Sequence, residues 1–240
     1  MPWLGSKRIA FIPLYRTIPA PPDQIPTNWA ADIQQRIEFD NRTGTDKSLK
    51  AYISAASHGL ADLEATIFPM ESIDQQDVPV DALESRMGAQ LRAQGFDAAA
   101  IVMLGGPGAG SNLGFWSRFV MREGVGVWAM ELMHSLTGFG DLYSFNGNMG
   151  GFDQMACNCA THPSAYTKAA IQWIDSSKIV RHNGLAGVYP LRPVGLGASQ
   201  NGGAYSAVRV GDEVPYLLVE ERKRTDQFET GIPSEGVIVY

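Results

Sequence analysis

The sequence predicts an α+β fold, α/β-like in that helices alternate with strands, followed by a small β region. Two segments carry this prediction. Ala98–Leu104 is continuously apolar, which is typical of a central strand covered on both faces, and Ala61–Phe68 alternates apolar with polar residues, as a strand does. Between them, Val80–Gln94 has the amphipathic pattern of a helix, which Gly95 should end.

The composition favours a well-packed protein and excludes several classes. Of the 240 residues, 45% are hydrophobic and 18% are charged, so the chain has ample material for a core. Lys and Arg number 19 against 25 Asp and Glu, and the net charge of −6 argues against nucleic acid as the main partner. No stretch approaches the roughly 18 apolar residues of a membrane span.

The N-terminal segment Met1–Arg8 lacks the apolar stretch of a secretory signal peptide. We therefore expect either a cytoplasmic protein or one whose leader is absent from this chain, and the compartment stays open. The two cysteines are too few for a disulfide scaffold.

Four elements are expected before residue 60: a buried strand at Arg8–Tyr15, a loop at Pro19–Pro26, and helices at Asn28–Phe39 and Lys47–Ser57. Asp46 stands where the N-cap of the second helix should lie. Gly59 is suited to end that helix, because glycine adopts the left-handed conformation of a helix C-terminus.

After the central strand, a glycine-rich loop at Gly105–Gly114 is interpreted as the rim of a cleft, and Phe115, Trp116 and Phe119 as core or cleft wall. Further elements are expected in this order: a helix at Gly124–Thr137, a loop at Gly138–Pro163, a helix at Ala165–Ile174 capped by Ser164, and strands at Val188–Leu191, Ala204–Val210, Tyr216–Glu220 and Val237–Tyr240. The charged run Glu220–Arg224 is interpreted as a solvated strand end.

The expected boundary between the α/β part and the β part lies near Asp175–Asn183. This gives a first domain over residues 1–175 and a small β region over residues 176–240.

The helix at Gly124–Thr137 carries the most informative pattern, Glu131-x-x-His134. Residues 130 and 134 lie one turn apart on one helix face. Zinc peptidases place two histidines at such positions, with a glutamate general base after the first. Here Met130 stands in the first position. On its own the pattern is equally typical of an ordinary helix in which His134 makes a local hydrogen bond.

The surrounding residues extend the pattern. Gly138-Phe139-Gly140-Asp141 comes after the helix, then Gly151–Met155, and then His162–Lys168 with Trp173. This order resembles the immune inhibitor A family of metalloendopeptidases, which are metzincin-like and have the pattern His-Glu-x-x-His-x-x-Gly-x-x-Asp. Ser48–Gly59 and Tyr216–Val237 are also similar to segments of that family.

The resemblance implies a metzincin-type zincin domain, with a long active-site helix under a mixed sheet, that hydrolyses peptide bonds of a substrate bound in a cleft. It implies zinc as the cofactor, with His134 and Asp141 as ligands and Met130 at the position of the missing histidine. It also implies that Glu131 is the general base, which takes a proton from metal-bound water, and that Met155 belongs to the Met-turn.

The chain departs from the family pattern twice. A thioether is a weak ligand for zinc, so Met130 should lower zinc affinity. In addition, Ser135-Leu136-Thr137 has one residue more than the family pattern before the glycine, and an added helical residue rotates the rest of the helix by about 100°. Three functions therefore stay open: a metallopeptidase-like hydrolase, an inactive pseudo-peptidase that binds ligands in the same cleft, and a metal-independent enzyme in which Glu131 and His134 act as acid and base.

Other side chains offer weaker substitutes for the missing ligand. His162 is interpreted as part of local loop structure, and His58 and His182 as surface residues. Cys157 and Cys159 would close a small strained ring if oxidised, and would offer soft thiolate ligands if reduced. The favoured interpretation is that they are two small buried cysteines.

Overall fold

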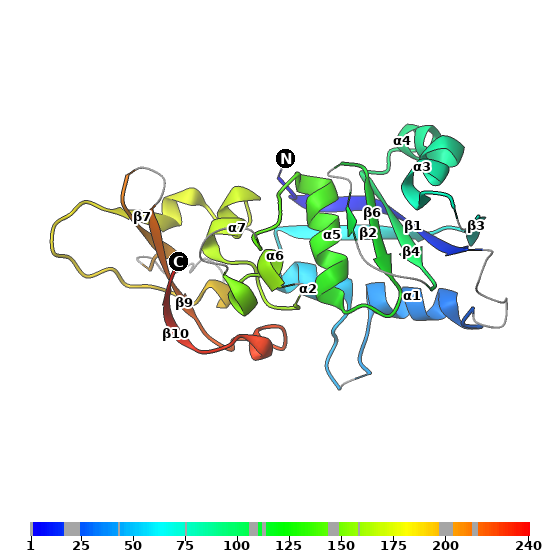
Figure 1. Cartoon of the computed structure of the whole chain (residues 1–240). Coiled ribbons are helices and arrows are strands. Elements are labelled where there is room, and N and C mark those ends of the chain that lie inside the picture. Colours follow the sequence, from blue (N-terminus) through cyan, green and yellow to red (C-terminus); the bar gives the residue numbers. More distant parts are fainter. Residues whose placement is uncertain are drawn as a thin grey trace.

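The computed structural model describes residues 2–16, 25–42, 44–74, 76–105, 110–111, 114–143, 149–157, 159–196, 204–212 and 216–240. Its larger sheet has helices on both faces, and a smaller sheet lies at the other end of the molecule (Figure 1). This architecture confirms the α+β class at the coarse level.

The larger sheet is mostly parallel. Its strands are β1 (Gly5–Arg16), β2 (Ala61–Ile67), β3 (Glu71–Ile73), β4 (Ala98–Met103), β5 (Gly110–Ser111) and β6 (Trp116–Val120). They have the order β2-β1-β4-β6-β5, and β3 pairs with the far end of β1. Every pairing is parallel except that of β5 with β6, so the sheet is mixed, with an antiparallel edge strand.

Strand β4 occupies the centre of this sheet, and all six of its residues are buried, as its continuous apolar sequence predicts. Ala98, Ala100 and Val102 face the core that contains helices α1 (Trp29–Glu38), α2 (Leu49–Ala56) and α5 (Val125–Thr137). The alternate residues Ala99 and Ile101, with Met103, face a second core that contains helices α3 (Pro79–Leu83) and α4 (Ala89–Ala93). The strand thus joins two helix layers through opposite faces.

The helices are α1 (Trp29–Glu38), α2 (Leu49–Ala56), α3 (Pro79–Leu83), the π-helical turn η2 (Glu84–Gly88), α4 (Ala89–Ala93), α5 (Val125–Thr137), α6 (Gln154–Cys157) and α7 (Ala165–Ala170), together with short 3₁₀ turns. The single helix expected at Val80–Gln94 is therefore α3, η2 and α4 in succession. Gly95, with φ of +78°, ends it as expected.

The N-cap of α2 differs from the prediction. Ser48 is the cap, and its Oγ accepts a hydrogen bond from the Ala51 amide at 3.2 Å. Asp46 lies two residues earlier, where its Oδ1 accepts from the amides of Ser48 and Asp40. Both residues have cap chemistry, so spacing alone could not separate them.

The smaller sheet has the order β10-β9-β8-β7, and its strands are β7 (Ile179–His182), β8 (Ala207–Val210), β9 (Leu217–Arg222) and β10 (Gly236–Val239). The strand predicted at Val188–Leu191 is wrong, because Val188 is 95% exposed and only Leu191 makes a bridge, to Tyr205. Strand β7 was not predicted; it lies inside the segment expected to be the boundary.

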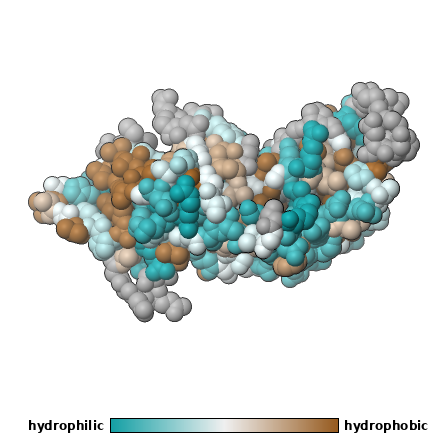
Figure 2. Space-filling model, turned by 90° about the horizontal axis from the view of Figure 1, so that it is seen from below, coloured by the Kyte–Doolittle hydropathy of each residue, from teal (hydrophilic) through white to brown (hydrophobic). Residues whose placement is uncertain are grey.

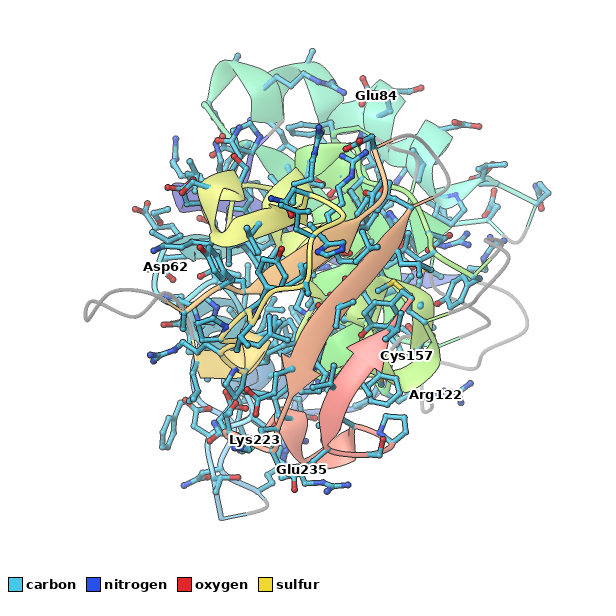
Figure 3. All side chains as sticks on the ribbon, turned by 90° about the vertical axis from the view of Figure 1, so that its left-hand side faces the viewer. Asp62, Glu84, Arg122, Cys157, Lys223 and Glu235 are labelled. Carbon is cyan, nitrogen blue, oxygen red and sulfur yellow. A yellow bond between two sulfur atoms is a disulfide. The ribbon has the colours of Figure 1, made fainter. Side chains whose placement is uncertain are left out.

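The two faces of the small sheet have an unusual distribution of residues. Glu220 and Arg222 on β9 are fully buried, which contradicts the prediction of a solvated strand end. The Arg222 guanidinium donates to Glu220 at 3.2 Å and to Glu229 at 2.8 Å, so these charges are paired inside the protein. Lys223 and Glu235 lie at the end of the β9–β10 pair in Figure 3 and are exposed.

The opposite face of the same sheet is aliphatic and open to solvent. Leu217, Val237 and Val239 are each more than half exposed, and Val239 pairs with Val219 on the same face. Figure 2 shows hydrophobic surface gathered at this end of the molecule. Alternation along the strands explains the arrangement, because a strand that buries Glu220 and Arg222 must expose Val219 and Glu221.

Contacts join the segments on either side of residue 175. The Ala165 amide donates to the Glu220 carboxylate at 2.7 Å, and the Gln227 side-chain amide donates to the Asp46 carbonyl at 2.6 Å. The division into residues 1–175 and 176–240 stays a prediction. Within the described ranges, no helix combines the length and apolar character needed to cross a membrane.

Candidate active site

Helix α5 holds the residues expected to form the site. It comes after β6 and a short turn, and packs against the larger sheet through Trp128, Leu132 and their neighbours. Thr137 is its last residue, and Gly138 has φ of +74°, the left-handed conformation that ends a helix. The extra residue before the glycine therefore lengthens the helix by one position, and the chain reverses only afterwards.

Helix α5 approaches the segment after Met155 very closely at Gly126. A Cβ atom on Gly126 would lie 2.6 Å from the Ala160 nitrogen and would overlap the Cys159 carbonyl group. The side-chain amide of Gln154 also donates to the Gly126 carbonyl at 2.6 Å. A residue without a side chain is thus required for the helix and this segment to pack together.

The imidazole of His134 has a fixed orientation. Its Nδ1 donates to the Phe139 carbonyl at 2.6 Å, because a carbonyl oxygen can only accept. Nε2 lies 3.0 Å from Oδ1 of Asp141, so the structure brings together the two residues predicted as metal ligands. Histidines that bind metal through Nε2 commonly donate from Nδ1 to a carbonyl in this way.

Glu131 lies on the same helix and is 7% exposed. Burial, with a further contribution from the negative charges of Asp141 and Glu123, raises its pKa to about 7. Among the described residues, its Oε2 atom has no hydrogen-bond partner. Glu131 is therefore a carboxyl group that gains and loses its proton near neutral pH.

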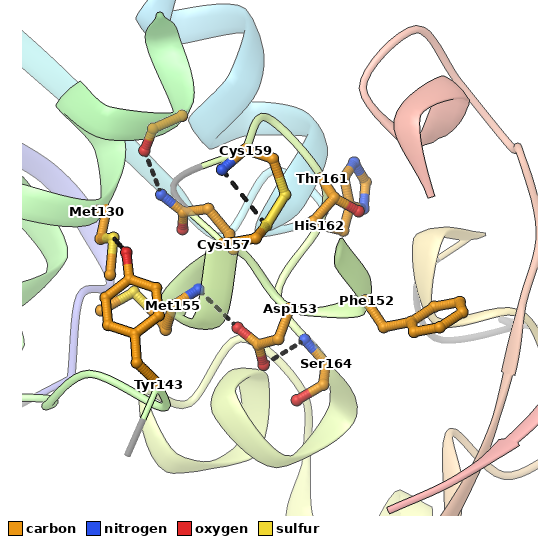
Figure 4. The surroundings of a disulfide bond; sticks show 12 residues. Met130, Tyr143, Phe152, Asp153, Met155, Cys157, Cys159, Thr161, His162 and Ser164 are labelled. Atoms are coloured by element: carbon orange, nitrogen blue, oxygen red, sulfur yellow. Dashed lines mark hydrogen bonds between the residues drawn. A yellow bond between two sulfur atoms is a disulfide. The ribbon is translucent and has the colours of Figure 1, made fainter. Parts of the chain in front are cut away.

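Met130 fills the position of the first expected histidine. It is 1% exposed, and its sulfur accepts a hydrogen bond from the Tyr143 hydroxyl at 3.4 Å (Figure 4). Met155 belongs to the same buried cluster. Burial, together with Asp141 and Glu131, raises the pKa of Tyr143 to about 12, so this hydroxyl keeps its proton and acts as the donor.

These residues do not fit a catalytic zinc ion. Such sites use three protein ligands of the His, Cys, Asp or Glu type. His134 and Asp141 supply two, and nowhere in the described ranges do three such side chains converge as a metal group would require. The buried thioether of Met130 supplies no third ligand of this type.

The two cysteines are joined in a disulfide between Cys157 and Cys159, shown in Figure 4. The interpretation as two free cysteines is therefore wrong, and so is the proposal of thiolate ligands, because a disulfide sulfur carries no negative charge. The preceding segment is held by Asp153, which accepts from the amides of Met155 at 2.8 Å and Ser164 at 3.0 Å.

His162 and His58 make their contacts with residues other than His134. His162 is fully buried, and its amide donates to Glu229 at 2.7 Å, in agreement with a structural role. His58 is half-buried rather than on the surface, and its Nε2 lies 2.9 Å from Nζ of Lys168. Burial lowers the pKa of Lys168 to about 7 and that of His58 to about 3.

Lys168 and Tyr143 are two residues whose contacts the sequence did not predict. Lys168 is a lysine on a short helix, and no sequence pattern shows that it points inwards. Tyr143 lies two residues after Asp141, and that position was the available signal. The glycine-rich loop Gly105–Gly114, predicted as the rim of the cleft, lies mostly outside the described residues, so its prediction stays untested.

No profile of a known protein family matches the chain, and no curated protein is significantly similar to it. The resemblance to immune inhibitor A-like peptidases therefore rests on the motifs themselves.

Proposed function

We propose that this chain is a metzincin-type, peptidase-like domain that no longer holds a catalytic zinc ion and that binds a peptide or small-molecule ligand without cleaving it. The fold supports the first half of the proposal. A mixed sheet with an antiparallel edge strand precedes α5 directly, and α6 with Met155 contacts that helix. His134 and Asp141 lie within hydrogen-bond distance, as the family motif implies.

The observation that carries the loss of zinc is the environment of Met130. At the place of a metal ligand there is a buried thioether that accepts a hydrogen bond from Tyr143. The Nε2 atom of His134 lies 3.0 Å from Oδ1 of Asp141, and because Nδ1 donates to Phe139, this contact is a hydrogen bond when the imidazole carries a proton on both nitrogens. The Asp141 side chain is also half exposed to solvent, so its charge does not require a metal ion to offset burial.

A second candidate function is acid–base chemistry without a metal, and Glu131 favours it. A carboxyl group with a pKa of about 7 exists in both protonation states at neutral pH, which suits a group that accepts and then returns a proton. Among the described residues, its buried Oε2 atom has no hydrogen-bond partner, so this carboxyl oxygen is not committed to a structural contact there. His134 would hold the adjacent loop through Phe139 and Asp141.

The test of the main proposal restores the missing ligand. We expect purified wild-type protein, incubated with zinc and then dialysed, to retain far less than one zinc per chain by elemental analysis. The variant Met130→His should retain about one zinc per chain, because three ligands then converge. Met133→His is the matched control, since Met133 is equally buried but is not expected to face His134 and Asp141.

Two results would contradict the proposal. One is a full zinc equivalent in wild-type protein. The other is a Met130→His variant that folds, judged by circular dichroism, and still binds no zinc. Casein hydrolysis by Met130→His, absent in wild type, would show in addition that Glu131 retains its role as general base.

Glu131→Gln separates the two candidate functions. Glutamine keeps the size of the side chain but cannot take up a proton. If the domain only binds ligands, this variant should bind as the wild type does. If Glu131 performs acid–base chemistry, turnover of a substrate found by screening should fall by about 100-fold or more.

A further inference from the structure

A pocket of about 390 Å³ lies between α7 and the inner face of the small sheet. Its volume is in the range of small-molecule sites. Ala169 and Ala170 line it from α7, and Ile179 and Leu218 from β7 and β9. These four side chains give the pocket an apolar floor.

Two arginines stand together at the same pocket. Arg181 on β7 and Arg209 on β8 are direct partners in the parallel pairing of the strands, so both side chains project from one face of the sheet. Like charges at such a position destabilise a sheet unless an anion compensates them. The two positive charges are therefore concentrated beside an apolar hollow rather than spread over the surface.

One carboxylate compensates part of this charge. Asp212 forms an ion pair with Arg181 at 3.2 Å, but both side chains are largely exposed, so the pair is weak. The Arg209 guanidinium donates to the carbonyls of Gly211 at 3.2 Å and Asp212 at 2.7 Å. Neutral carbonyls orient this guanidinium without neutralising it, so the pocket keeps an excess of positive charge.

Two tyrosines complete the walls. The Arg209 guanidinium lies 4.0 Å from the centre of the Tyr216 ring, a cation–π contact that fixes the plane of both groups. Tyr166, on the other side, is 39% exposed and forms an edge contact with Phe139 at 6.0 Å. A flat apolar body between these rings would replace water on aromatic surface, while the arginines would meet its charged end.

From this combination we infer that the pocket binds a carboxylate attached to an aromatic or large aliphatic body, as found in a free organic acid or at the C-terminal residue of a peptide. The arginines bind the carboxylate in the bidentate geometry that guanidinium groups favour. The alanines, Ile179 and Leu218 accommodate the apolar body. The site is separate from Glu131 and His134, and its binding does not depend on the proposed function.

A physical connection nevertheless links the two places. Tyr166 in the pocket wall contacts Phe139, and the Phe139 carbonyl accepts the hydrogen bond that orients His134. A ligand that moves Tyr166 therefore acts on the residue that holds the imidazole. The ¹⁵N shifts of the His134 ring report such a movement by nuclear magnetic resonance.

The inference is tested by isothermal titration calorimetry on the whole chain with N-acetyl-L-phenylalanine and with its amide. The two compounds share the apolar body and differ in the charged group. We expect saturable binding of the acid and at least about tenfold weaker binding of the amide, because a hydrogen bond to a charged group is lost. A short peptide ending in phenylalanine, with a free or an amidated C-terminus, forms the second arm.

The peptide experiment distinguishes a peptide C-terminus from a small organic acid as the ligand. Tighter binding of the free peptide than of the single amino acid identifies a peptide C-terminus as the ligand, and equal binding identifies a small acid. Either result supports the carboxylate inference.

Substitutions of residues in and outside the pocket test whether the acid binds there. Arg181→Gln and Arg209→Gln should each weaken binding of the acid by about tenfold. Arg224→Gln removes the same charge from an exposed arginine that does not line the pocket, and should leave affinity unchanged. Asp212→Asn removes the competing carboxylate and should tighten binding. Ala170→Trp, at an exposed position, fills the hollow without changing charge and should abolish binding.

Three outcomes would overturn the inference. They are equal affinity for the acid and the amide, no binding of the acid at millimolar concentration, and unchanged affinity in both arginine variants that fold as the wild type does. A circular dichroism spectrum of each variant establishes the last condition.

Discussion

At the scale of single residues, the most unusual group is Glu131. It is a buried carboxyl group on helix α5, whose other residues are almost all buried. Its pKa of about 7 lies above the ordinary value of 4.5 because burial disfavours the charged form. The unfolded chain therefore ionises first as pH rises. The folded protein keeps this proton to higher pH than the unfolded chain does, so the free energy of unfolding falls between pH 5 and pH 8.

We predict that Glu131→Gln removes this pH dependence. Relative to the variant, wild-type protein should lose about 2 kcal/mol of unfolding free energy between pH 5 and pH 8. Urea unfolding of both proteins at the two pH values measures the difference. A wild-type and variant pair whose stability gap stays constant across this range would show that Glu131 ionises normally.

The sequence singled out candidate site residues but could not place them. Compared with the family pattern that the motifs resemble, Met130 stands where a histidine is expected and one more residue precedes Gly138. Whether Asp141 could still reach His134 depended on where the helix ended, and a shift of one residue is beyond what helix-end signals resolve. The burial of Lys168 was also beyond reach, because lysine on a helix usually faces solvent.

At the scale of elements, the packing of α5 against the Cys159 segment depends on Gly126. We predict that Gly126→Ala destabilises the protein by about 2 kcal/mol or more, since its Cβ would overlap backbone atoms that cannot move independently. Gly124→Ala is the matched control. Gly124 has φ of −66° and open space around its Cα, so the change should cost below about 1 kcal/mol.

Thermal and urea unfolding of the two glycine variants checks this prediction. Similar losses of stability in both would mean that the close approach between α5 and the Cys159 segment relaxes at little cost, and the packing described for the site would need revision.

Sequence patterns predicted the elements whose apolar residues follow a regular pattern. Strand β4 is apolar throughout, and helix α2 places its apolar residues on one face. Strand β6 was not expected, since Trp116–Val120 mixes aromatic residues with Ser117 and Arg118. The aromatic residues were interpreted as core or cleft wall, and Trp116 and Phe119 are buried. Strand β7 is four residues long and contains a charged residue, which is too little for a period to show.

At the scale of the whole molecule, a buried ionic network connects the small sheet to the helices beside it. We predict that Arg222→Met costs about 3 kcal/mol or more, because Glu220 and Glu229 would remain buried without their partner. Lys223→Met, one residue further and largely exposed, should change stability by less than about 0.5 kcal/mol. Urea unfolding at pH 7 compares the two.

A small loss in the Arg222 variant would mean that the two glutamates take up protons and tolerate the change. The network explains why the interpretation of Glu220–Arg224 as a solvated strand end was wrong for Glu220 and Arg222. The charged residues of a strand normally face solvent, whereas here Glu220 and Arg222 lie inside, and Val219 shares the outer face with Glu221. A sequence pattern gives the two faces of a strand but not which of them is buried.

The central claim is that two ligands without a third do not hold a catalytic zinc ion. It is tested most directly by the zinc affinity of wild-type protein, measured by competition with a chromophoric chelator at pH 7. The account predicts a dissociation constant weaker than roughly micromolar, unchanged in Asp141→Asn. Stoichiometric binding on the order of nanomolar, lost in both His134→Ala and Asp141→Asn, would contradict it.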